Sequence, residues 1–174
     1  MSKKSTGIAL ILLSVFVALV GCDSLQPEVR WESYENRFIK MDYPAEWTYE
    51  EVESEVMIAM RFVDEEEEFV FEMSITGIEN WMEEEEKLEM MEEVAIEQSR
   101  EEGFEILENE AIEIDGYPGF KIVDQQEDRG TRQTIATVFH YQQLAINFAG
   151  TDEAYNEQVE IVNEMVDSIE VIVK

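Results

Sequence analysis

The sequence predicts an α+β fold, an α/β/α sandwich around a central and largely antiparallel sheet. Three observations predict it: short segments of alternating apolar and polar residues, closely spaced turn signals, and two longer segments with helical periodicity. The predicted order is strands, a helix, four strands and a second helix, so hairpins dominate. With 45% apolar residues in 174, the chain has a globular composition and fits a single domain.

Strands account for most of the first half of the chain. Each predicted strand either alternates between apolar and polar residues or is mostly apolar and too short for a helix. Pro44 ends the first strand, and the turn after it leads into a strand that begins near Trp47. The run of five acids from Asp64 to Glu68 suits a solvated hairpin loop. The other strands are predicted over residues 37–43, 56–63 and 69–76.

A helix is predicted to begin at Asn80 and to end at Gly103. The Asn80 side chain can cap the first turn, and Glu83 completes a pattern that resembles a capping box. Leu88 and Met91 belong to an apolar stripe with helical spacing. Glycine is the residue that most often follows the end of a helix, so Gly103 predicts the C-terminal boundary.

The second half predicts two further hairpins and a final helix. Asp115 and Gly116 form a strong signal for a two-residue turn between strands. Thr151 or Asp152 caps the last helix, which has an apolar face that includes Tyr155. The predicted segments are strands over 104–114, 117–123, 131–141 and 144–148, a polar loop over 124–130, and a short strand or tail over 171–173.

The first residues of the chain read as a leader rather than as part of the fold. Lys3 and Lys4 form a short positive region, and residues 8–20 are apolar except for one serine. This apolar segment is too short to span a membrane comfortably, because spanning needs about 20 apolar residues. Its length and flanking charge are typical of a secretory signal peptide.

The segment Leu19-Val20-Gly21-Cys22 resembles the lipobox of bacterial lipoproteins. The resemblance implies cleavage between Gly21 and Cys22, and lipid attachment, for example of palmitate, to the Cys22 thiol. Residues 1–21 would then be a signal peptide, 22–33 a lipidated tether and 34–174 the domain. We therefore expect a lipid-anchored protein of the cell membrane that faces outside the cytoplasm. The alternatives are an ordinary signal peptide followed by an accidental cysteine, or a short signal anchor.

The segment Tyr34 to Trp47, YENRFIKMDYPAEW, resembles the opening of PsbP-like domains. The hairpin from Ile114 to Gly119 and the final Met-Val-Asp-Ser-Ile segment ending at Ile169 also fit that family. The resemblance covers about residues 34–172 and implies the Mog1/PsbP-like α/β/α sandwich. It implies a fold and no activity, and no binding residue of the family is recognisable here.

Few residues qualify as catalytic or metal-binding candidates. Cys22 is the only cysteine and His140 the only histidine, so neither a disulfide framework nor an ordinary zinc site is predicted. His140 lies in a predicted strand without a nucleophile beside it, which favours a structural role. Trp31, Trp47 and Trp81 could be ligand platforms, but core packing is the favoured interpretation.

The strong negative charge excludes some partners and favours others. The chain carries 42 acidic against 12 basic residues, a formal charge of −30, so no basic face is available for nucleic acid. The acidic runs at 64–68 and 83–86 lack the spacing of an EF-hand, and we expect diffuse counterion association instead. The acidic residues repel one another and have too few basic partners, and salt would screen this repulsion. We therefore predict a medium of high salt or high pH, and so a halophilic or alkaliphilic source.

These observations together predict a non-catalytic binding or assembly module at the membrane surface. No catalytic residue, cofactor or metal site is predicted, and the sequence does not identify the protein partner. Two alternatives stay open: a hydrolase or ligand-processing enzyme that uses unrecognised carboxylates, and a Ca²⁺-responsive lipoprotein.

Overall fold

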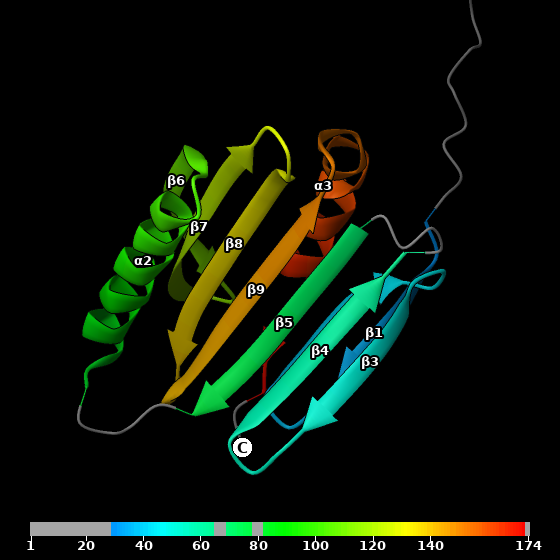
Figure 1. Cartoon of the computed structure of the whole chain (residues 1–174). Coiled ribbons are helices and arrows are strands. Elements are labelled where there is room, and N and C mark those ends of the chain that lie inside the picture. Colours follow the sequence, from blue (N-terminus) through cyan, green and yellow to red (C-terminus); the bar gives the residue numbers. More distant parts are fainter. Residues whose placement is uncertain (1–28, 65–68, 78–81, 173–174) are drawn as a thin grey trace, which may run out of the picture.

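The chain folds around a seven-stranded sheet with the strand order β3-β4-β5-β9-β8-β7-β6 (Figure 1). The computed structural model describes residues 29–64, 69–77 and 82–172. All six neighbouring strand pairs are antiparallel, which confirms the predicted hairpin topology. The strands are β3 (Thr48–Glu53), β4 (Met57–Val63), β5 (Phe69–Gly77), β6 (Glu105–Ile114), β7 (Tyr117–Gln126), β8 (Gly130–Phe139) and β9 (Gln142–Gly150).

A second, three-stranded sheet lies behind β3 and β4 (Figure 1). It consists of β1 (Trp31–Glu35), β2 (Ile39–Pro44) and β10 (Glu170–Val171), in the order β1-β2-β10. The sequence predicted only one sheet. Strand β1 begins within the last three residues assigned to the tether, and it was missed because Tyr34 is its only buried residue.

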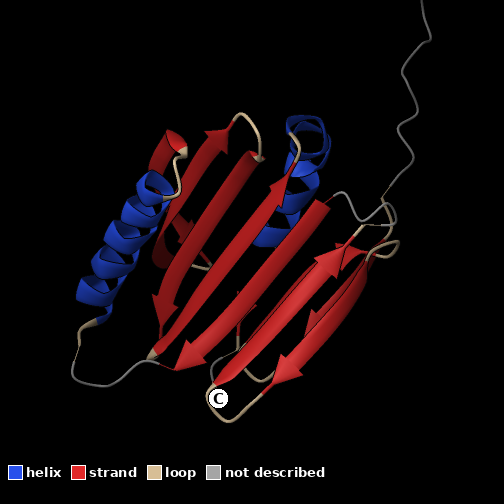
Figure 2. Ribbon diagram, in the orientation of Figure 1, coloured by secondary structure: helices blue, strands red, loops and turns tan. Residues whose placement is uncertain are grey.

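The two helices lie on opposite faces of the large sheet (Figure 2). Helix α2 (Glu84–Glu101) packs over β6, β7 and β8, where Leu88 and Met91 contact Phe120 and Ile122. Helix α3 (Asp152–Asp167) shares its face with the small sheet. This arrangement confirms the predicted α/β/α layering. Across the residues that the structure describes, neither helix combines the length and apolar character needed to cross a membrane.

The main core lies between the large sheet, the small sheet and α3. Phe62 and Phe71 meet edge to face, with ring centroids 5.7 Å apart, and both are fully buried. Tyr155 of α3 stacks on Phe148 of β9 with centroids 4.9 Å apart, which fixes the helix against the sheet. Trp47 is buried against Phe69, so it serves the core rather than a ligand.

Two predicted turn positions are confirmed by their backbone angles. Asp115 and Gly116 both have positive φ, 49° and 80°, as the two-residue hairpin between β6 and β7 requires. Gly103 follows the end of α2 with a φ of 82°. That left-handed conformation costs glycine little, because it has no Cβ.

The predicted beginning of the first helix is wrong. Helix α2 begins at Glu84, and Glu83 is the residue before it, without a side-chain capping hydrogen bond. The first turn instead carries three glutamates, whose charge is favourable beside the unpaired N–H groups there. Asn80, the predicted cap, lies outside the described residues. At the second helix, Thr151 caps Ala154 N as predicted.

Two further predictions are corrected near β8. His140 is not in a strand: together with Tyr141 it forms the two-residue turn from β8 to β9, with φ of 46° and 61°. The strand ends earlier because Phe139 pairs directly with Gln142. Asp124 is not in a loop either, since β7 continues to Gln126 and buries this carboxylate beside an arginine.

Candidate functional site

Helix α2 covers only half of the face on which it lies (Figure 2). It contacts β6, β7 and β8, while β9, β5, β4 and β3 carry no described element on this side. The other face is closed by α3 and the small sheet. The open half is therefore a broad sheet surface that no described element covers.

Small and polar side chains form the floor of this open half. Because side chains alternate along a strand, the residues facing outward are fixed by the register. Three rows cross the floor from β4 through β5 to β9: Ala59, Ser74 and Ala145; Arg61, Glu72 and Asn147; and Val63, Val70 and Ala149. The alanines and serine leave room above the sheet between β3 and α2.

Two adjoining hollows occupy this room, and we call them together the sheet groove. One has a volume of about 340 Å³ and reaches Glu50 and Val52 of β3. The other has about 480 Å³ and reaches Ala95 and Gln98 of α2. Arg61, Glu72 and Asn147 line both hollows and form the centre of the groove. The remaining lining residues are Ala59, Met60, Met73 and Ser74 in the first hollow, and Val70, Arg132, Thr134 and Ala149 in the second.

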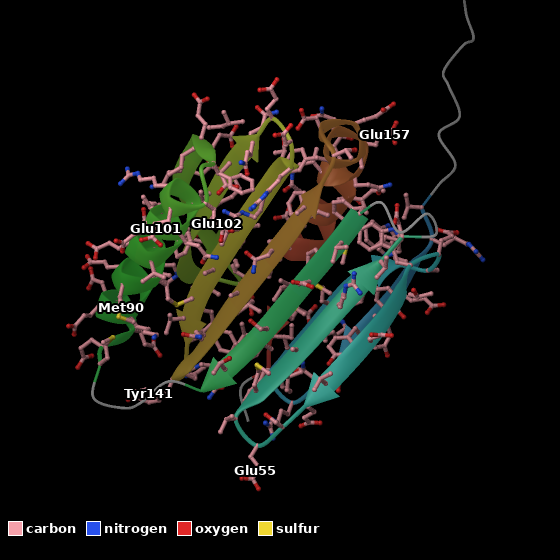
Figure 3. The ribbon with its side chains drawn as sticks, viewed as in Figure 1. Glu55, Met90, Glu101, Glu102, Tyr141 and Glu157 are labelled. Atoms are coloured by element: carbon pink, nitrogen blue, oxygen red, sulfur yellow. The ribbon has the colours of Figure 1, made fainter. Side chains whose placement is uncertain are left out.

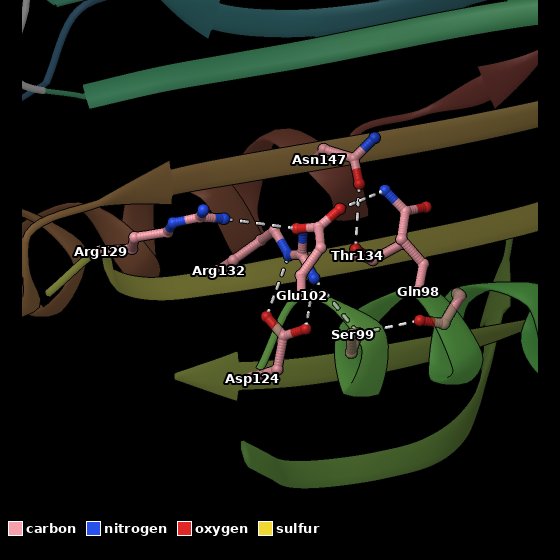
Figure 4. Close-up of polar contacts among 9 residues, drawn as sticks. Gln98, Ser99, Glu102, Asp124, Arg129, Arg132, Thr134 and Asn147 are labelled. Atoms are coloured by element: carbon pink, nitrogen blue, oxygen red, sulfur yellow. Dashed lines mark hydrogen bonds and ion pairs between the residues drawn. The ribbon is translucent and has the colours of Figure 1, made fainter. Parts of the chain in front are cut away.

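Arg132 closes the groove beneath the last turn of α2 (Figure 4). Its Nε and Nη2 donate to the two oxygens of Asp124 at 3.0 and 2.6 Å. Its Nη1 donates to Glu102 Oε2 at 3.2 Å, and Nη2 also donates to Ser99 Oγ at 3.2 Å. The guanidinium lies 4.3 Å from the centre of the Phe104 ring. All its charge is compensated, so it positions α2 and is not available to an anion.

The electrostatics of this network follow from its hydrogen bonds. Asp124 accepts from the guanidinium and raises the pKa of Arg132, although burial works in the opposite direction. The pKa of Glu102 is lowered first by the hydrogen bond from Gln98, 2.8 Å long, and then by Arg132. Both groups are therefore held in their charged forms.

Arg61 is compensated in a similar way at the exposed end of the groove. It lies directly opposite Glu50 on β3 and Glu72 on β5. Its Nε is 3.8 Å from Glu72 Oε1, a loose and solvent-exposed pair. Asn147 beside it accepts a hydrogen bond of 3.0 Å from Thr134 Oγ1. Each groove arginine thus lies between two carboxylates, and neither is left as an unpaired cation.

The architecture matches solved structures of known proteins. No protein-family model and no curated protein matches the sequence significantly. The solution structure of cyanobacterial PsbP (CyanoP) from Synechocystis superposes with a TM-score of 0.64 at 13% identity, covering 89% of this chain and 99% of that one. The chain has the Mog1/PsbP-like fold.

Two further structures with lower scores share this Mog1/PsbP-like fold. The Ran-binding protein Mog1p of Saccharomyces cerevisiae matches with a TM-score of 0.53 at 9% identity, covering 82% of this chain and 96% of that chain. LpqN of Mycobacterium tuberculosis, described as involved in cell envelope biogenesis, matches with a TM-score of 0.51 at 9% identity. The match covers 84% of this chain and 92% of LpqN. At such low sequence identities the structural likeness establishes the fold, which the sequence resemblance predicted. It does not establish an activity.

The groove of this Mog1/PsbP-like domain lacks a recognisable catalytic constellation. Ser74 and Thr134 supply its hydroxyl groups, and no histidine is among the residues that line it. Nucleophilic catalysis needs a base within hydrogen-bond reach of the hydroxyl. Within the described part of the chain, no three His, Cys, Asp or Glu residues gather as a metal site would require.

The residues singled out from the sequence lie away from the groove. His140, in its turn, shares a 2.7 Å hydrogen bond with the hydroxyl of Tyr117. Trp31 is half-buried against the main core. Glu84 and Glu85, at the beginning of α2, line a separate hollow on the other side of that helix, together with three further glutamates and no lysine or arginine. Gly21, Cys22 and Trp81 lie outside the described residues.

Sequence reasoning did not find the groove itself. The one available signal is the pair of small residues, Ala59 and Ser74, at positions that alternation assigns to the outward face of neighbouring strands. Their smallness becomes meaningful only once the position of α2 shows that nothing described packs on them.

Proposed function

We propose that the chain is a lipid-anchored, extracytoplasmic module that binds a partner in the sheet groove and performs no catalysis. The observation that carries the proposal is the half-covered sheet: a hollowed surface of small, polar and charge-compensated side chains beside α2. Antiparallel sheets often leave one face to solvent, so openness alone says little. The hollowing of this face between β3 and α2 is what supports a role in binding.

The anchoring part of the proposal rests on the leader and Cys22. Two or more acyl chains would hold the protein stably at the membrane, whereas a single chain binds only marginally. From Cys22 to Trp31, where β1 begins, nine residues span at most about 30 Å. The tether therefore keeps the acidic domain near the membrane but allows it to stay beyond the Debye length of about 8 Å. An envelope location agrees with the described role of LpqN.

The absence of catalysis is proposed from the chemistry of the shifted carboxyl groups. A general acid needs a raised pKa, but the pKa values of Glu102 and Asp152 are both lowered. Hydrogen bonds from Gln98 and from Gln125, respectively, are the largest causes. Mog1p, which shares this fold, is a Ran-binding protein, and this also supports a binding role here.

The anchor is tested by replacing its attachment residue. We expect the full chain, expressed with its leader and fed an alkyne-labelled palmitate, to carry the label and to sediment with membranes. Cys22→Ala should lose the label and the membrane association, and Ser24→Ala serves as the matched control. Unlabelled wild-type protein in the cytosol with its leader attached would contradict the proposal.

The binding surface is tested by photo-crosslinking in native membranes. Val52 lines the groove and its side chain is 64% exposed, so benzoylphenylalanine fits there without disturbing the core. The same photoprobe at Glu157 on α3 provides the control (Figure 3). We expect a discrete adduct from position 52 and none from position 157. No adduct from position 52, or equal adducts from both, would reject the groove as the binding surface.

A further inference from the structure

We infer that the sheet groove receives a cationic amphipathic helix of a partner protein; this inference rests on the proposed function. The first reason is dimensional. Neighbouring strands lie about 4.8 Å apart, so the four uncovered strands β9, β5, β4 and β3 offer a width of about 14 Å from the first to the last. An α-helix with its side chains is about 10 Å wide, so the uncovered strands have room for one helix. The partner helix would complete a layer of which α2 forms half (Figure 1).

The second reason is the apolar character of the groove walls. Val52 on β3 is 64% exposed, and Val94 on α2 is 55% exposed. Val94 lies one helical turn before Gln98, which lines the groove, so both residues are on the same side of α2. Between these walls, Ala59 and Ala149 are low apolar positions on either side of the polar row Arg61, Glu72 and Asn147. This combination of apolar and polar positions suits an amphipathic helix more than a fully polar ligand.

The same face already accepts one helix in this manner. Leu88, Met91 and Ala95 of α2 pack on the outward side chains of the covered strands, where Phe120 and Ala136 form the floor. A second helix beside α2, at the usual separation of 8–10 Å between axes, would contact the side of α2 that carries Val94.

The third reason is charge. The clusters Glu50–Arg61–Glu72 and Asp124–Arg132–Glu102 each contain one cation and two carboxylates. Neither leaves a cation for an anionic ligand, and the whole chain carries a formal charge of −30. Opposite charge accelerates association and favours a basic partner. A second copy of this chain is a poorer occupant, because it would bring an equal negative charge to the interface.

The experiment identifies the segment that reaches the groove. The full chain with benzoylphenylalanine at Val52 is irradiated in its native membranes, and the crosslinked peptide is sequenced by mass spectrometry. We expect a segment with net positive charge and apolar residues at i, i+3, i+4 and i+7. An acidic segment, an alternating strand-like segment, a peptide of this chain itself or a small-molecule adduct would each overturn the inference.

A charge reversal supplies the second readout. Glu50 is an exposed residue of an edge strand, so Glu50→Lys leaves the core intact. We expect it to lower the crosslinking yield roughly tenfold at low salt, and much less in molar NaCl. Glu157→Lys changes the net charge equally but lies on α3, and should leave the yield unchanged. Equal effects of the two variants would show general attraction and overturn the inference. A missing adduct in every case would instead reject the proposed function.

Discussion

At the scale of single residues, the pair of Asp124 and Arg132 is the most consequential polar contact. The Asp124 carboxylate is almost entirely buried, with 2% of its side chain exposed, and Arg132 supplies two of its hydrogen bonds. Burial of a charge is tolerated only where a partner compensates it. The pair joins β7 to β8 and, through Glu102 and Ser99, holds the end of α2 beside the groove.

Removal of Arg132 should therefore be costly. We expect Arg132→Leu to lower the free energy of unfolding by about 3 kcal/mol, because Asp124 is left as an unpaired buried charge. Urea denaturation measures the change. Arg61→Leu removes the exposed groove arginine and should cost less than about 1 kcal/mol. Similar costs for the two variants would contradict the assignment of Asp124 and Arg132 as the structural pair.

The buried tyrosines make stability depend on pH in the alkaline range. Burial raises the pKa of Tyr155 to about 12, with a further contribution from the charge of Glu108. Burial and the hydrogen bond to Glu51 raise the pKa of Tyr34 as well. An unfolded tyrosine has a pKa of about 10, so the folded state holds these protons more tightly. Their contribution is therefore fully present below pH 10 and is lost as the pH rises through the folded-state values.

We expect the free energy of unfolding to fall between pH 10 and pH 12, and to fall less steeply in Tyr155→Phe. That variant also loses the 3.1 Å hydrogen bond to Gln133, worth about 1 kcal/mol at neutral pH, so the slope is the quantity to compare. Urea denaturation at several alkaline pH values measures the slope. Tyr141→Phe, which alters an exposed tyrosine, should keep the wild-type slope. An unchanged slope in Tyr155→Phe would contradict the role of burial.

At the scale of elements, the turn between β8 and β9 uses residues that fit its geometry poorly. His140 and Tyr141 both adopt positive φ, which is unfavourable for residues with a Cβ. Tyr141 N donates to Glu84 of α2, and His140 is hydrogen-bonded to Tyr117. These contacts, together with the pairing of Phe139 and Gln142, hold the turn in place.

Replacing one of these residues by glycine should stabilise the protein. We expect Tyr141→Gly to raise the free energy of unfolding by about 1 kcal/mol, because the backbone N–H contact survives and the strain is removed. Gly116→Ala, at a φ of 80° in the other two-residue turn, should cost about as much. Thermal denaturation of both variants measures the two effects. If Tyr141→Gly is less stable than the wild type, the contacts of the aromatic ring contribute more free energy than the positive φ of Tyr141 costs.

The elements also show which local signals in the sequence are sufficient. Alternation predicted most strands, and Asp115-Gly116 and Gly103 marked real boundaries because their chemistry fixes the backbone locally. The turn at His140 carried no such residue, and β1 carried a single buried side chain. Asp124 looked like a loop residue, because its burial depends on Arg132, which lies across the hairpin. Those outcomes depend on tertiary contacts that local patterns do not contain.

At the scale of the whole molecule, the layered fold could be predicted but the groove could not. Alternation assigns Ala59 and Ser74 to one face, yet it does not say which strands a helix will cover. That depends on where α2 packs, which the contacts of Leu88 and Met91 with β7 and β8 decide. The fold follows from many consistent local patterns, whereas an uncovered surface follows from the position of one helix.

The charge of the whole molecule leads to the final prediction. The formal charge is −30, and α2 adds like-charged pairs one turn apart, such as Glu85 with Glu89 and Glu89 with Glu93. Each pair costs a few tenths of a kcal/mol in the absence of salt. Salt shortens the Debye length from about 30 Å at 0.01 M to about 3 Å at 1 M, so it removes most of this repulsion.

We therefore expect the melting temperature to rise by several degrees between 0.01 M and 1 M NaCl, as measured by circular dichroism. The variant Glu85→Gln/Glu89→Gln/Glu93→Gln should be more stable than the wild type at low salt and should gain less from added salt, because part of the repulsion is already absent. This comparison separates screening from general effects of salt on apolar surface, which would act equally on both proteins. A melting temperature that does not change with salt would remove the basis for expecting a saline or alkaline environment.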